Sequence, residues 1–153
     1  MDYEVFPLMV DSASMEKLPR WERGTAAVFC AAGPHPIPVT TAIRASDHRV
    51  LLTLGGRRET LRRVRATPHA ALCVLTEGLA FSAIGSAKVV QEGLKAAPGL
   101  AVVELDVVEL VDHLLDGRTE MLSPAGWRWL DDDSAESEPK VLAELERLAA
   151  AAR

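Results

Sequence analysis

Apolar and β-branched residues recur along this chain in short runs separated by glycine, proline and polar residues. This pattern is typical of β-strands joined by turns. The six runs that predict strands cover residues 24–33, 39–45, 49–54, 69–76, 79–91 and 100–114. The fifth run contains Gly85, which predicts a bulge or a bend because glycine weakens a strand and lets another backbone come close. Three prolines within residues 34–38 exclude a helix and favour an extended edge or a turn.

One segment between the third and fourth runs changes to a helical period. In residues 57–66, Leu61 and Val64 are three positions apart and arginines occupy the other faces. This spacing predicts a short amphipathic helix. The helix should end near Thr67, because Pro68 disfavours helical backbone in the residue before it.

The C-terminal part of the chain predicts a linker followed by a helix. Residues 131–138 are acidic and polar, which favours a mobile linker. Residues 139–153 predict a helix with Pro139 in its first turn. Its apolar stripe consists of Val141, Leu142, Leu145 and Leu148. This stripe must be buried, either on the body of the protein or on a second subunit.

Together these elements predict a mainly β fold of the α+β class, with one short helix between the third and fourth strands. Six short strands joined by turns favour an antiparallel sheet that closes into a small barrel. A chain of 153 residues is most simply a single compact unit with a core of its own. The predicted organisation is a barrel domain over residues 1–130, the linker over 131–138 and the helix over 139–153.

The composition excludes several classes of function. A formal net charge of −5 argues against nucleic acid as the main partner. No apolar run approaches the roughly 18 residues of a membrane span. The N-terminus lacks the basic and apolar regions of a secretory signal, so we expect a cytoplasmic protein without a membrane partner. The two cysteines and four histidines show no metal-ligand spacing, so no metal site is expected.

Five arginines stand close together in this acidic chain, at positions 57, 58, 62, 63 and 65. They follow a Gly-Gly pair, and a glycine break before a helix offers free backbone N–H groups to an anion. Arginine adds bidentate, charge-assisted hydrogen bonds to phosphate oxygens. We therefore interpret Arg57 and Arg58, at the helix start, as contacts to a phosphate-bearing cofactor. A solvated helix face is the alternative, above all for Arg63 and Arg65.

Three motifs in this order resemble the pyridoxamine 5'-phosphate oxidase-like split β-barrel superfamily. The segment Pro34-His-Pro-Ile-Pro-Val39 is similar to the family's opening of the second strand. Residues 53–68 resemble its strand, loop and basic helix, which end at a proline before the fourth strand. Gly85-Ser86-Ala87 resembles its G-x-A motif in the fifth strand. The resemblance covers about residues 12–115 and implies a six-stranded antiparallel split β-barrel.

The resemblance also implies a cofactor and an assembly. Proteins of this family are typically homodimers that bind FMN, or the deazaflavin F420, between subunits, and some bind haem. By position, Val39, Thr40 and Thr41 would line the ring. The residues implied near the phosphate are Thr53, Arg57, Arg58 and Thr60.

This sequence departs from the family pattern in two places. Thr60 stands where the family has a phosphate-binding lysine, which shifts the expected phosphate contacts to Arg57 and Arg58. The C-terminus lacks the arginine-containing signature of true pyridoxamine phosphate oxidases, so vitamin B6 synthesis is not predicted. Trp127 and its neighbour Trp129 pack at the dimer interface or stack near the cofactor from the partner subunit.

The first functional hypothesis is an FMN-binding oxidoreductase that transfers a hydride or electrons to an unknown small organic substrate. The second is an F420-dependent reductase, in which the long anionic tail of the cofactor would employ Arg62 and Arg65. The third is a non-catalytic flavin- or haem-binding module. The residue order indicates no nucleophile with an adjacent base, so no catalytic residue is assigned. A cofactor that carries the redox chemistry itself is consistent with that absence.

Overall fold

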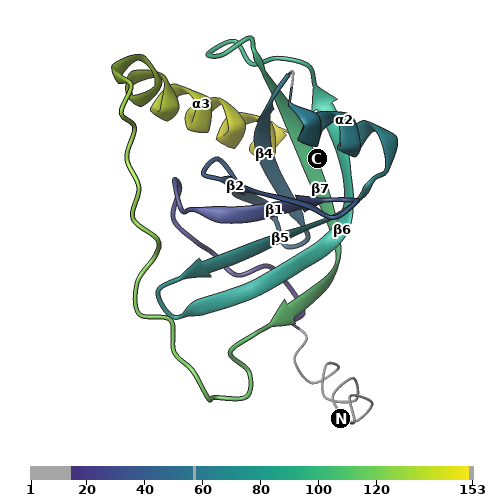
Figure 1. The fold of residues 1–153 in the computed structure, drawn as a ribbon, viewed down its shortest axis with the longest axis vertical. Helices are drawn as coiled ribbons and strands as arrows, with labels where there is room; N and C mark the ends of the chain where they lie inside the picture. The colour runs from purple at the N-terminus through teal and green to yellow at the C-terminus, as the bar shows by residue number, and fades with distance from the viewer. Residues whose placement is uncertain (1–14, 57, 152–153) are drawn as a thin grey trace.

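The computed structural model describes residues 15–56 and 58–151 (Figure 1). Seven strands and two helices follow one another along this part of the chain. In order they are β1 (Ala27–Ala31), β2 (His35–Val39), β3 (Ile43–Ser46), β4 (Arg49–Gly55), α2 (Glu59–Ala66), β5 (His69–Thr76), β6 (Leu79–Gln91), β7 (Leu100–Asp112) and α3 (Asp132–Ala151). All strand pairs are antiparallel, and the strand order is β2-β1-β5-β6-β7-β4-β3. The mainly β prediction is therefore confirmed, whereas the predicted count of six strands is wrong.

The additional strand arises from the segment that connects the two edges of the sheet. β2 is one edge strand and β3 is the other, yet only residues 40–42 separate them in the sequence. Four Cα steps join Val39 to Ile43, so the end of one edge strand lies within about 14 Å of the start of the other. The sheet must therefore curl into a barrel that is split between β2 and β3. The single strand predicted at 39–45 is in fact the last residue of β2, a crossing at residues 40–42 and most of β3.

Prolines explain why β2 can only be an edge strand. Pro36 and Pro38 lack an N–H group and cannot donate to a second neighbour, and β2 pairs with β1 alone. The predicted extended edge at residues 34–38 is confirmed in this form. Gly33 precedes β2 with a φ of 128°, a backbone conformation that glycine adopts without steric cost.

The long strands β6 and β7 pair with each other in the sheet. Their register shifts between Ile84 and Gly85, so the bulge predicted at Gly85 is confirmed. A Cβ added at Gly85 would lie 2.0 Å from the carbonyl oxygen of Asp106 in β7. Glycine is needed here because the two backbones approach closer than any side chain allows.

Two apolar clusters hold the molecule together. The first fills the barrel with side chains from the inner faces of the strands, and Leu61 and Val64 of α2 join it. The second lies outside the barrel, where Val141, Leu142 and Leu145 of α3 pack on Ile43, Leu51, Leu94 and Val102. The apolar stripe predicted for the C-terminal helix is thus buried on the protein's own sheet. Figure 1 shows α3 lying along the side of the sheet near β4.

The boundaries of the two helices test the sequence rules for helix ends. α2 ends at the C-cap residue Thr67, as predicted from Pro68. α3, in contrast, begins at Asp132 rather than near Pro139, so the predicted linker 131–138 forms the first turns of a helix. Asp131 explains the difference, because its carboxylate accepts the Ser134 N–H at 3.1 Å and caps the helix. No helix in the described part of the chain has the length and apolar character to cross a membrane.

Candidate functional site

The split between the sheet edges opens into a cavity of about 630 Å³. Its walls come mainly from β2 and the β2–β3 connector, the end of β4, and the C-terminal segment that includes α3, with Ala97 and Leu100 completing them. Six of the residues predicted to contact a cofactor line this one cavity. They are Val39, Thr40, Thr41, Thr53, Arg58 and Trp127. Residues far apart in the sequence therefore meet in one place.

Two threonines fasten the connector to β4 on the wall of the cavity. The Thr41 hydroxyl oxygen accepts the Thr53 N–H at 3.0 Å and the Thr53 hydroxyl at 3.0 Å. Thr53 lies beyond the end of β3, so the Thr41 side chain replaces the missing strand neighbour. Two hydroxyl protons are present and one is used between the pair. One therefore stays available to donate into the cavity.

A glycine turn places Arg58 at the end of β4. The Gly56 N–H donates to the Gly99 carbonyl oxygen at 2.9 Å, and the Arg58 N–H donates to the Gly55 carbonyl oxygen at 3.1 Å. The stem of Arg58 lies over Gly55, where an added Cβ would come within 3.3 Å of the Arg58 Cγ. A second cavity of about 620 Å³ adjoins the first across this turn and is also lined by Arg58.

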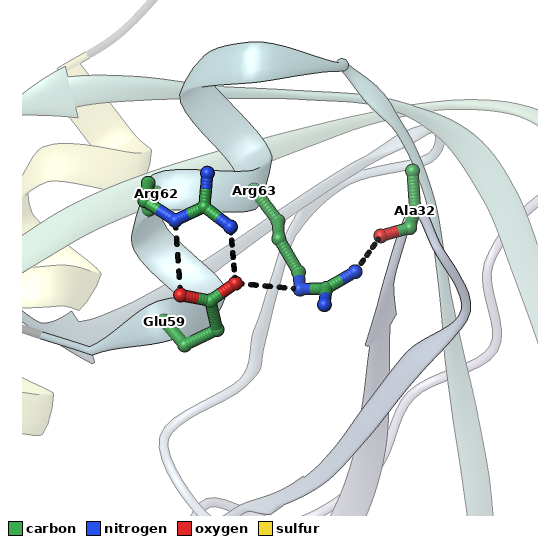
Figure 2. A network of polar contacts seen from close by, with 4 residues as sticks. All are labelled: Ala32, Glu59, Arg62 and Arg63. Carbon is green, nitrogen blue, oxygen red and sulfur yellow. Dashed lines mark hydrogen bonds and ion pairs between the residues drawn. The ribbon is translucent and has the colours of Figure 1, made fainter.

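Most of the arginine cluster is neutralised by carboxylates. Figure 2 shows that Arg62 donates hydrogen bonds to both carboxylate oxygens of Glu59, and that Arg63 contacts the same carboxylate. The Arg63 Nε–H donates to Glu59 Oε2 at 3.0 Å. Arg63 also donates to the carbonyl oxygen of Ala32 at 3.1 Å. The hydrogen bond from Arg62, together with the charges of both arginines, lowers the pKa of Glu59 to about 2. Arg62 and Arg63 thus act mainly as partners of Glu59.

Arg58 differs from its neighbours in the cluster. Arg65 pairs with Glu92 at 2.6 Å, whereas within residues 15–56 and 58–151 no carboxylate lies within ion-pair distance of the Arg58 guanidinium. Its positive charge is therefore available to a ligand in the cavity that Arg58 lines. Arg57, the other arginine predicted to hold a phosphate, lies outside the described residues.

Two predicted contact residues are not at this cavity. Thr60 belongs to α2 and is buried on the inner face of this helix, with 1% of its surface exposed. The Arg62 side chain points to Glu59. Neither is among the residues that line the cavity. Helix geometry explains the separation, because Thr60 shares the inner face of α2 with Leu61 and Val64.

The tryptophans lie on the cavity of their own chain. The Trp127 Nε1–H donates to the Gly24 carbonyl oxygen at 2.8 Å, which ties the C-terminal segment to the residues before β1. The Trp127 and Trp129 rings meet edge to face with centroids 5.5 Å apart, and both line the cavity. The contact at the dimer interface or from a partner subunit that the sequence suggested stays a prediction.

The first two turns of α3 supply lining residues that sequence reasoning missed. Ser134, Ser137, Glu138 and Val141 all face the cavity. Assigning residues 131–138 to a linker hid this face. The signal was present, because positions 134, 137, 138 and 141 continue the stripe of the C-terminal helix backwards at helical spacing.

A buried carboxylate holds α3 in this position. Glu144 is 6% exposed, and its two oxygens accept the N–H groups of Lys95 and Ala96, each at 2.9 Å. Burial alone would raise the pKa of Glu144, but these N–H groups and the charges of Arg147 and Lys95 lower it below its ordinary value. The loop held in this way contains Ala97, which also lines the cavity.

Comparison with known proteins identifies the architecture. The sequence matches no protein-family model and no curated protein. A candidate pyridoxamine 5'-phosphate oxidase from Lactobacillus delbrueckii matches in structure with a TM-score of 0.52 and 16% identity, over 63% of this chain and 94% of that one. The chain has the pyridoxamine 5'-phosphate oxidase-like fold. A general stress FMN/FAD-binding protein from Xanthomonas citri matches with a TM-score of 0.50 and 17% identity, over 71% and 89% of the two chains. HupZ from Group A Streptococcus matches with a TM-score of 0.51 and 12% identity, over 82% of this chain and 100% of that one.

The pyridoxamine 5'-phosphate oxidase-like fold of this chain has a cavity whose wall combines positive charge with apolar and aromatic surface. Arg58 supplies positive charge at the end of β4, and Val39, Trp127 and Trp129 supply apolar and aromatic surface. The threonine pair supplies a hydroxyl donor. A few polar groups on a mostly apolar wall are typical of small-molecule and cofactor sites.

Proposed function

We propose that this protein binds FMN in the cavity at the split of the barrel and acts as an oxidoreductase on a small organic substrate. The observation that carries the proposal is the set of lining residues. Five positions implied by the sequence resemblance lie on one cavity together with Trp127, and among them Arg58 has no carboxylate partner in the described part of the chain. A phosphate would neutralise that charge.

The residues present fit this cofactor. Arg58 would hold the phosphate, assisted by Arg57, which takes the place of the family's lysine in our proposal. Val39, Thr40 and Thr41 would lie along the ring, with Thr53 fixing Thr41. When bound, the flavin supplies hydride or electron transfer, and the chain supplies position and electrostatics.

The lining of the same cavity bears on two alternative cofactors, F420 and haem. F420 has a longer anionic tail, and the second cavity beyond Arg58 offers room for it. The tail contacts proposed for that case, Arg62 and Arg65, are already paired with Glu59 and Glu92. Haem is disfavoured because the lining residues of the cavity include no His, Cys, Met or Tyr to hold iron. A flavin-binding module without turnover is the remaining alternative, and a substrate assay separates it from an enzyme.

Arg58→Ala should weaken FMN binding by about tenfold to a hundredfold, because a charge-assisted hydrogen bond to phosphate is lost. Arg62→Ala is the matched control and should change the affinity less than twofold, since Arg62 pairs with Glu59 instead of lining the cavity. The measurement is a titration of flavin fluorescence, after a visible absorption scan of the purified protein with and without added FMN.

The two variants give a clear criterion. Equal losses from Arg58→Ala and Arg62→Ala would show that the phosphate does not lie at Arg58. A protein that stays colourless after incubation with FMN and desalting would overturn the proposed function itself. A single deazaflavin band after incubation with F420, combined with no FMN binding, would replace FMN by F420.

We also propose that the protein forms a homodimer with the cofactor at the subunit interface. Support comes from the outward face of β1, β5 and β6, which is mostly apolar and partly exposed. Its residues are Val28, Cys30, Ala71, Cys73, Leu75 and Ile84. Val28 pairs with Cys73, and Ala71 pairs with both Cys30 and Ile84, so the patch is continuous across three strands. An apolar surface of this kind marks an interaction site.

Val28→Glu should convert the dimer into a monomer, because an unpaired charge would be buried at the interface. Val28 is 41% exposed in the single chain, so the monomer should tolerate the glutamate. Leu122→Glu, at an exposed position in the loop before α3, is the control and should leave the dimer intact. Light scattering after gel filtration measures the mass. A monomeric wild-type protein at micromolar concentration would refute the homodimer.

A further inference from the structure

Glu138 lines the cavity and carries a buried carboxylate oxygen without a hydrogen-bond partner among the described residues. The residue belongs to α3 and lines the cavity wall. Its Oε2 atom is buried, and no group in the described part of the chain hydrogen-bonds to it. A buried acceptor without a donor is rare in folded proteins, and a carboxylate oxygen in that state is more costly than a neutral group.

The side chains around Glu138 do not supply the missing donor. The Ser134 hydroxyl donates to Asp131, and the Ser137 hydroxyl donates to the Ser134 carbonyl oxygen at 3.2 Å. Arg58 and Arg128 line the same cavity, but among the described residues neither forms an ion pair with Glu138. A donor for this oxygen would therefore have to come from outside the described residues, and a ligand in the cavity that Glu138 lines could supply one.

We propose that Glu138 accepts a hydrogen bond from the imide N–H of the bound cofactor ring. This inference rests on the proposed function and goes beyond it by naming the donor that the site selects. Flavins and deazaflavins share this N–H, which lies in the ring system, away from the phosphate-bearing chain. The cavity then holds the two chemically different ends of one ligand, with Arg58 at the anion and Glu138 at the ring donor.

If this proposal is right, Glu138 lowers the stability of the ligand-free protein but strengthens the binding of FMN. Without a ligand, the unpaired oxygen opposes folding, so Glu138→Ala should melt at or above the wild-type temperature. With FMN, the variant lacks the acceptor, so the rise in melting temperature on adding FMN should be smaller than for wild type. A residue with a purely structural role would lower the melting temperature of the ligand-free protein.

The decisive experiment removes each partner of the hydrogen bond in turn. FMN and N3-methyl-FMN, which lacks the imide proton, are titrated into wild type and Glu138→Ala. Losing a hydrogen bond to a charged group should weaken FMN binding to the variant by about tenfold. Methylation should weaken binding to wild type by about tenfold as well, but by less than threefold in Glu138→Ala, where the partner is gone and the smaller side chain leaves room for the methyl group.

Glu136→Ala is the matched control. Glu136 lies on the same helix and carries the same charge, but it is exposed and does not line the cavity. It should bind both flavins as wild type does.

The outcomes separate this inference from the proposed function. Suppose that Arg58→Ala weakens FMN binding, while N3-methylation of FMN lowers the affinity of wild type and of Glu138→Ala by the same factor. The cofactor site then stands, and the role proposed for Glu138 is wrong. In that case, water in the cavity satisfies the carboxylate. If wild type binds neither flavin, the proposed function fails and this inference fails with it.

Discussion

Replacing Gly85 with alanine is expected to lower the free energy of unfolding by about 3 kcal/mol or more. The added Cβ would lie 2.0 Å from the Asp106 carbonyl oxygen, 2.9 Å from its carbonyl carbon and 3.0 Å from the Val107 Cα. All three atoms belong to the backbone of β7, so no side-chain rotation can relieve the overlap. β6 and β7 each pair with strands on both sides, which prevents either from moving away alone.

Urea unfolding followed by circular dichroism measures this effect. Gly126→Ala is the control, because an added Cβ there meets nothing within 4 Å and the stability should change by less than about 0.5 kcal/mol. A loss below about 1 kcal/mol in Gly85→Ala would show that the bulge relaxes at little cost. The close approach of β6 and β7 would then not be a requirement of the fold.

Replacing Glu144 with alanine should cost about 3 kcal/mol of unfolding free energy at neutral pH. The buried carboxylate accepts two backbone N–H groups, and each hydrogen bond to a charged group contributes about 1.5–3 kcal/mol. The N–H groups of Lys95 and Ala96 would lose their partner. Because Glu144 connects α3 to the β6–β7 loop, the variant should also weaken the C-terminal wall of the cavity.

The pH dependence of Glu144 has a defined sign. Its folded-state pKa lies below the ordinary value of 4.5. Ionised Glu144 therefore stabilises the fold fully above the unfolded pKa, and this contribution is lost as pH falls through the folded pKa. The stability difference between wild type and Glu144→Ala should shrink on acidification.

Glu146→Ala provides the comparison for this acid series. Glu146 is half-exposed and pairs with Arg23 at 3.6 Å, so its loss should change stability by less than about 1 kcal/mol at any pH. Denaturant unfolding at several pH values measures both variants. A difference between wild type and Glu144→Ala that stays constant down to the acid limit would contradict the charged role of Glu144.

Local patterns determined a large part of this fold. The alternation of apolar and polar residues located most strands, Gly85 marked the bulge, and Pro68 marked the end of α2. These features depend on the preferences of a few neighbouring residues, so they can be inferred without knowing the rest of the chain. The same rules failed at α3. They predict a helix that begins at Pro139, whereas the helix begins at Asp132 and is capped by Asp131.

The arginine cluster shows where local inference stops. The sequence alone predicted Arg57, Arg58 and Arg62 as cofactor contacts, and it left Arg63 and Arg65 open. The structure shows the partners of Arg62, Arg63 and Arg65. These partners are Glu59, the Ala32 carbonyl oxygen and Glu92. Glu92 lies 27 positions from Arg65, and no local periodicity encodes such a meeting.

The sequence by itself determined most of the strands and the basic helix, and six of the residues that it predicted as cofactor contacts line one cavity. Only the tertiary structure decided that the sheet is split where residues 40–42 cross between its edges, and that Trp127 and α3 close the cavity from the same chain. It alone revealed Glu138 as an unpaired acceptor there. The physical reason is the same in each case. Secondary structure follows from neighbours in the sequence, whereas a cavity is formed by long-range packing, which depends on the whole chain at once.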